Sequence, residues 1–114
     1  MLDAIEGIEA TVGEAGFAEY ARSWTMRRAV ERGIEIISEA SRHLPDELKA
    51  HYPQVYWQEI ASIGNLLRHQ YGRVDDRIMW RVVEKYLPEL KDVVLDMQRP
   101  SAPAKERGGR SRPR

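Results

Sequence analysis

The segment that ends one of the expected helices holds the side chains best suited to chemistry. Asn65, Arg68, His69 and Tyr71 fall within seven consecutive residues, and Gly72 follows them. A histidine takes up or releases a proton near neutral pH, so His69 is a candidate general acid or base. Asn65 lies one helical turn before His69, where it is placed to pair with the imidazole. The pattern predicts a polar site at the end of a helix.

Each candidate also has a purely structural interpretation. A single histidine at a helix end is more often an ordinary surface residue, and Arg68 fits a solvated charge equally well. Tyr71 fits a core-edge aromatic as well as a modification site. Glu35 and Glu39 share one helix face at a spacing of four residues, so either both are exposed or one of them faces a groove. The residues alone leave these alternatives open.

Helical periodicity runs through most of the chain, and Gly and Pro fall mainly between the periodic segments. We expect helices over residues 2–12, 25–43 and 57–71, with Thr25 as a cap and an irregular segment from Phe17 to Ser23. Further helices should begin near Pro45 and Asp75, and again at Pro88 after a bend. Antiparallel helices with short connections predict an all-α fold, a four-helix up-and-down bundle with an extra short helix.

The expected core is a set of apolar stripes at helical spacing. Val30, Ile34 and Ile37 form the stripe of the long second helix, and Ile36 should widen it. Ile78 is expected on the inward face of the helix that begins near Asp75.

The composition limits the class of protein. A chain of 114 residues has room for one domain with one core. It has no cysteine, which excludes disulfides and thiolate metal sites. No run of about 18 apolar residues occurs, so we expect no membrane span and a cytoplasmic protein.

The formal net charge is zero, but the charge is unevenly spread. Residues 99–114 carry six basic side chains and one acidic side chain, whereas the rest of the chain carries 12 basic and 17 acidic ones. We expect a folded domain over residues 1–97 and a disordered basic tail over residues 98–114. An acidic body argues against a protein that coats nucleic acid generally, and it leaves room for a local basic cleft.

Several blocks of this sequence resemble, in order and spacing, the HepT-like branch of the HEPN superfamily. The blocks are Ile34-Glu35-Ile36-Ile37-Ser38-Glu39-Ala40-Ser41-Arg42-His43-Leu44-Pro45, Tyr52-Pro53, Trp57-Gln58-Glu59-Ile60, Asn65 with His69 and Tyr71, Val74-Asp75, and Leu87-Pro88-Glu89-Leu90. The resemblance covers nearly all of residues 2–97. It implies the same all-helical fold.

The resemblance implies metal-independent RNA cleavage without a cofactor, in a type VII toxin–antitoxin system. His69 would act as acid and base in a groove between two copies of the chain, and Asn65 would orient it. The partner would be a nucleotidyltransferase antitoxin that attaches AMP to Tyr71, and transfer RNA is one candidate substrate.

The family motif places an arginine before the histidine with four to six residues between them, and the corresponding positions before His69 are Gly64, Ile63 and Ser62. Long helical side chains lean toward the helix N-terminus, so we expect Arg68 to enter the slot that Gly64 leaves and to replace the missing guanidinium. The alternative is a HEPN module that does not cut RNA but binds a nucleotide or holds the nucleotidyltransferase. Gly64 favours that alternative, whereas His69 together with Tyr71 favours the toxin.

Overall fold

The computed structural model describes residues 1–69 and 75–99, and this part of the chain is built from helices without strands. The elements, in order, are α1 (Leu2–Val12), α2 (Phe17–Arg22), α3 (Trp24–Arg42), α4 (Asp46–Ala50), α5 (Trp57–His69), α6 (Asp76–Arg81), the π-helical segment η1 (Val82–Tyr86) and α7 (Leu87–Gln98). The predicted all-α fold is confirmed. Tyr71 and the predicted tail beyond Arg99 lie outside the described residues.

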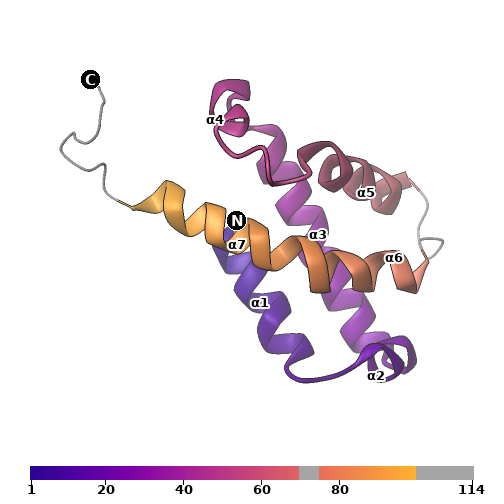
Figure 1. Cartoon of the computed structure of the whole chain (residues 1–114). Coiled ribbons are helices and arrows are strands. Elements are labelled where there is room, and N and C mark those ends of the chain that lie inside the picture. Colours follow the sequence, from indigo (N-terminus) through magenta and orange to yellow (C-terminus); the bar gives the residue numbers. More distant parts are fainter. Residues whose placement is uncertain (70–74, 100–114) are drawn as a thin grey trace.

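The long helix α3 organises the bundle (Figure 1). It packs against α5 on one side and α1 on the other, and α7 packs against α1. Its buried stripe includes Val30, Ile34 and Ile37, as the periodicity predicts. No helix in the described part is long and apolar enough to cross a membrane.

The helix ends follow from local side-chain chemistry. Ser23 begins α3, because its hydroxyl accepts a hydrogen bond from the Met26 N–H at 3.1 Å. Asp75 begins α6 in the same way, with its carboxylate 2.7 Å from the Arg77 N–H. Gly13 ends α1 with a φ of +57°, a conformation that glycine adopts without strain.

Three expectations about the elements were wrong. Phe17–Arg22 forms α2 rather than an irregular segment, because the Tyr20 ring packs 5.1 Å from the Trp80 ring and stabilises a helix too short to persist alone. The cap of α3 is Ser23 rather than Thr25. The turn before Pro88 is π-helical, so α6, η1 and α7 form one continuous helical run (Figure 1).

Two predicted core positions were also wrong. The side chain of Ile36 is 42% exposed because it lies outside the buried stripe of α3. Ile78 is 44% exposed, and the next two residues, Met79 and Trp80, are buried in its place. The inward face of α6 is therefore rotated by one residue from the predicted one.

The start of α5 is fixed by hydrogen bonds from two aromatic side chains. The Trp57 indole N–H is 3.2 Å from both the Lys49 and the Tyr52 carbonyl oxygens. The Tyr52 hydroxyl donates to Asp96 of α7 at 2.7 Å. Burial and this hydrogen bond raise the pKa of Tyr52 to about 12. These contacts tie α4, α5 and α7 together.

The helices α3 and α5 pack tightly against each other where Ser38 meets Gly64. Both residues are buried, and a Cβ atom added to Gly64 would overlap Oγ and Cβ of Ser38. Ser38 therefore fills the slot beside Gly64, and the expectation that Arg68 enters it was wrong. Glycine is needed at position 64 because the neighbouring helix occupies the space of any larger side chain.

We predict that Gly64→Ala lowers the free energy of unfolding by about 1–3 kcal/mol, because the added methyl group must push α3 and α5 apart. Gly7→Ala is the matched control. Gly7 also lies inside a helix, but a Cβ atom added there would meet no atom of another described element within 4 Å, so alanine should stabilise by about 0.5–1 kcal/mol. Urea unfolding measures both changes. A Gly64→Ala protein as stable as Gly7→Ala would contradict this packing.

Candidate active site

The candidate residues gather at the C-terminal end of α5. His69 is the last residue of this helix and is exposed to solvent. Asn65 is also exposed, and Arg68 is about one-third exposed. Gly64, which stands where the family motif has arginine, is buried against α3. The end of α5 thus presents a histidine, an arginine and an amide to solvent.

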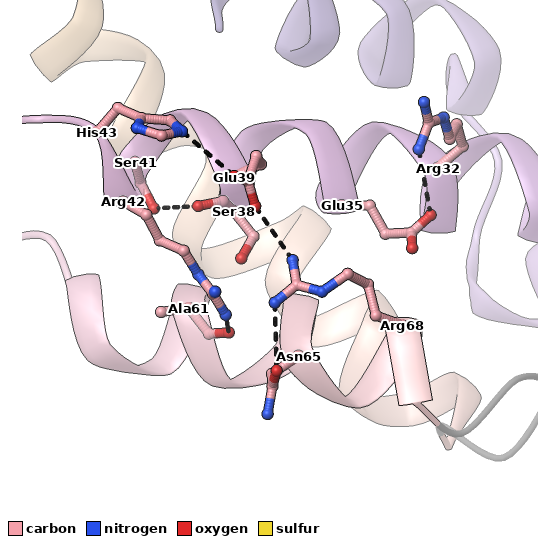
Figure 2. Close-up of polar contacts among 10 residues, drawn as sticks. All are labelled: Arg32, Glu35, Ser38, Glu39, Ser41, Arg42, His43, Ala61, Asn65 and Arg68. Atoms are coloured by element: carbon pink, nitrogen blue, oxygen red, sulfur yellow. Dashed lines mark hydrogen bonds and ion pairs between the residues drawn. The ribbon is translucent and has the colours of Figure 1, made fainter.

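The Arg68 side chain is held by two hydrogen bonds (Figure 2). Its Nη1 donates to Oε1 of Glu39 on α3, and its Nη2 donates to Oδ1 of Asn65, both at 3.2 Å. A guanidinium has five N–H donors, so three are free of these two contacts. The arginine is therefore fixed in direction while it keeps donors for a further anion.

The partner of Asn65 differs from the one the spacing suggested. Among the described residues its hydrogen bond goes to Arg68, and none joins it to His69. Asn65 therefore positions the guanidinium in this structure.

Glu39 is the site residue that the sequence did not single out. Its Oε1 accepts from Arg68, and its Oε2 lies 3.2 Å from Nε2 of His43, the residue that follows α3. The sequence placed Glu35 and Glu39 on one helix face, but it could not show which of these glutamates would contact a cation from α5. Glu35 instead pairs with Arg32 at 3.6 Å.

A shallow cavity of about 390 Å³ opens between α3 and Arg68. Glu35, Glu39 and His43 contribute to its wall on α3. The expectation that one of the glutamates faces a groove fits this arrangement, and both line it.

A second arginine connects the same two helices, this time from α3 to α5. Arg42 of α3 donates from Nη2 to the carbonyl oxygen of Ala61 on α5 at 3.4 Å (Figure 2). No sequence signal could have singled it out, because its partner is a backbone atom of a distant segment.

The fold and the site together define an all-α bundle in which an exposed histidine directly follows a positioned arginine in the sequence. Comparison with known proteins identifies the family. The model of the "Ribonuclease HepT-like" family matches residues 1–97. The chain belongs to this family, and the resemblance predicted from the sequence blocks is confirmed.

Individual relatives agree with this assignment. A protein of Thermococcus cleftensis named "Probable ribonuclease HepT" is 37% identical over 89 residues, which cover 78% of this chain and 81% of the relative. "Putative RNase TTE0752" of Caldanaerobacter subterraneus subsp. tengcongensis is 32% identical over 97 residues, which cover 85% of this chain and 80% of the relative. No solved structure matches the chain.

We predict that Glu39→Gln changes the free energy of unfolding by less than about 1 kcal/mol, because its ion pair with Arg68 is solvent-exposed. The substitution removes the competing negative charge, so inorganic phosphate should shift the Arg68 guanidinium NMR signals more strongly than in the unsubstituted protein. An unchanged phosphate response would show that Glu39 does not control access to Arg68. A much larger loss of stability would show that the ion pair contributes more than an exposed pair does.

Proposed function

We propose that this protein is an endoribonuclease in which His69 transfers protons and Arg68 contacts the scissile phosphate. The observation that carries the proposal is the double anchoring of Arg68 by Asn65 and Glu39. It supplies a positioned guanidinium on the residue that precedes His69, even though position 64 is glycine. Membership in the ribonuclease HepT-like family supports RNA as the substrate.

The chemistry follows from the properties of these side chains. The 2′-hydroxyl of RNA must lose a proton as its oxygen attacks the adjacent phosphorus. The bond to the 5′-oxygen then breaks, and that oxygen gains a proton. A histidine can accept the first proton or donate the second. Arg68 neutralises the charge that grows on the non-bridging oxygens, through N–H groups that Glu39 and Asn65 leave free. The products are a 2′,3′-cyclic phosphate and a 5′-hydroxyl.

We further propose that the protein acts as a homodimer in which two His69 sites share a groove. Apolar side chains support an interface on the face formed by α5 and α6. Leu66 is 39% exposed and Ile78 is 44% exposed, and both line one cavity with Tyr86. Tyr56, which is 57% exposed, packs against the ring of Tyr86 at 5.4 Å. Burial of such a patch is the usual reason for self-association.

The proposed partner is a nucleotidyltransferase antitoxin, which together with this toxin would form a type VII toxin–antitoxin system in the cytoplasm. Its proposed target is Tyr71, two residues after His69. Attachment of AMP there would add a negatively charged group near the histidine and repel the RNA backbone. Transfer RNA is the first substrate to test.

One observation favours a second candidate function. Ser38 occupies the space beside Gly64, so the motif arginine cannot be accommodated at this position without rearrangement. A protein that had lost its arginine could serve as a binding module for a nucleotide or for the nucleotidyltransferase, without cutting RNA. Cleavage assays separate the two functions.

We predict that the purified protein cleaves transfer RNA or total RNA in the presence of EDTA. His69→Ala should lower the rate at least about 100-fold, as loss of a general acid or base does. Arg68→Ala should lower it about 100- to 1000-fold, and Arg68→Lys less, because lysine keeps the charge but not the planar fork. His51→Ala, at an exposed histidine after α4, is the control and should be unchanged.

Two results would decide against these assignments. If the Arg68→Ala protein cleaves RNA at the full rate, Arg68 is not part of the active site. A folded protein that cleaves none of these RNAs would support the binding module.

We predict that Tyr71→Phe prevents labelling of this protein by its nucleotidyltransferase with radioactive ATP, because phenylalanine has no hydroxyl to accept the AMP. Tyr56→Phe is the control, since it removes another exposed tyrosine hydroxyl but keeps the ring that packs against Tyr86, and labelling should not change. Equal labelling of the Tyr71→Phe and unsubstituted proteins would place the modification elsewhere.

A further inference from the structure

A second polar cavity lies on the other side of Asn65 from the Arg68–Glu39 pair. It measures about 420 Å³, within the range of small-ligand sites, and it opens between the end of α3, α4 and the first half of α5. The polar and aromatic side chains that matter for its chemistry are Arg42, Lys49, Trp57, Gln58, Ser62 and Asn65.

Two cations face this cavity. The Arg42 guanidinium is held at its rim by the hydrogen bond to the Ala61 carbonyl oxygen at 3.4 Å, which uses one of its five N–H donors. The side chain of Lys49 is only 23% exposed, and its ammonium lies 3.9 Å from Asp46. Asp46 also lines the cavity, but its carboxylate is fully exposed, so solvent screens its effect on an anion bound there. The pair of cations suits a phosphate group.

The α5 wall supplies hydrogen-bonding groups at helical spacing. Gln58, Ser62 and Asn65 follow one another at four and three residues, so they share one face of the helix. Amide and hydroxyl groups of this kind can both donate to and accept from the edge of a base.

The aromatic wall is rigid. The indole N–H of Trp57 lies 3.2 Å from two backbone carbonyl oxygens, so the ring cannot rotate freely. Unpaired bases stack on aromatic rings and on arginine planes, whereas bases within a duplex cannot reach them. Trp57 and Arg42 offer both kinds of surface in one cavity.

Asn65 connects the cavity to the proposed active site. Asn65 lines the cavity and also accepts the hydrogen bond from Arg68. Ser62 lies seven residues before His69, which corresponds to roughly 10 Å along a helix. A single strand that runs along α5 would therefore meet His69 and this cavity in succession.

We infer that this cavity is a nucleotide-binding subsite that holds one unpaired nucleotide of the RNA beside the scissile bond. Arg42 and Lys49 bind its phosphate, Trp57 packs against its base, and Gln58 and Ser62 contact the base edge. The inference rests on the proposed ribonuclease function and adds to it a preference for single-stranded RNA. The subsite governs binding rather than proton transfer.

The test is RNA binding by the full chain with His69→Ala, which prevents cleavage during the measurement. The probe is a fluorescein-labelled single-stranded RNA of 12 nucleotides, followed by fluorescence anisotropy at several salt concentrations. Adding Arg42→Gln and Lys49→Gln should weaken binding at least 10-fold. The slope of log K against log salt should fall in magnitude by about 0.7, the value for one neutralised phosphate on a single strand.

The control is Arg22→Gln with Lys91→Gln, which removes the same charge from α2 and α7, outside the cavity. Its binding should change less than threefold. Equal losses for the two double variants would overturn the subsite, because the effect would then come from net charge. Unchanged binding by Arg42→Gln with Lys49→Gln would overturn it as well.

Cleavage kinetics separate failure of the subsite from failure of the proposed function. With His69 present, Arg42→Gln with Lys49→Gln should raise KM about 10-fold and leave kcat within threefold. Histidine-dependent cleavage with an unchanged KM would overturn the subsite alone. A folded, unsubstituted protein that neither binds nor cleaves RNA would overturn the proposed function and the subsite together.

Discussion

The contact between Ser38 and Gly64 is the constraint on which the rest of the site depends. It lets α3 and α5 approach so closely that side chains on either flank reach the opposite helix. Arg68 spans from α5 to Glu39 of α3, and Arg42 spans from α3 to the backbone of α5 (Figure 2). A larger residue at position 64 would separate the helices and lengthen both contacts.

This packing explains why the polar site lies between two helices rather than on one. An arginine at position 64 would need the space that Ser38 occupies. In the proposed site the guanidinium comes instead from Arg68, whose side chain is held by Asn65 and by Glu39. The close approach has a cost, since the buried Ser38 hydroxyl has no hydrogen-bond partner in the described part of the chain.

Much of the fold could be predicted from the sequence, because apolar residues at helical spacing mark each long helix. The short helix α2 could not, because it depends on the contact of Tyr20 with Trp80, far away in the chain. The site was predictable only in part. The residue types on α5 pointed to His69 and Arg68. The contact of Glu39 with Arg68 could be recognised only from the packing of α3 against α5.

The most direct test of the proposed arrangement is the RNA cleavage rate of Gly64→Arg, which restores the arginine of the family motif. If Ser38 occupies that space and Arg68 already contacts the phosphate, the substitution should disturb the packing of α3 on α5 and lower the rate at least about 10-fold. A Gly64→Arg protein that cleaves RNA faster than the unsubstituted chain would contradict it. Position 64 would then be a lost catalytic residue, and the contact between Ser38 and Gly64 would not determine the site.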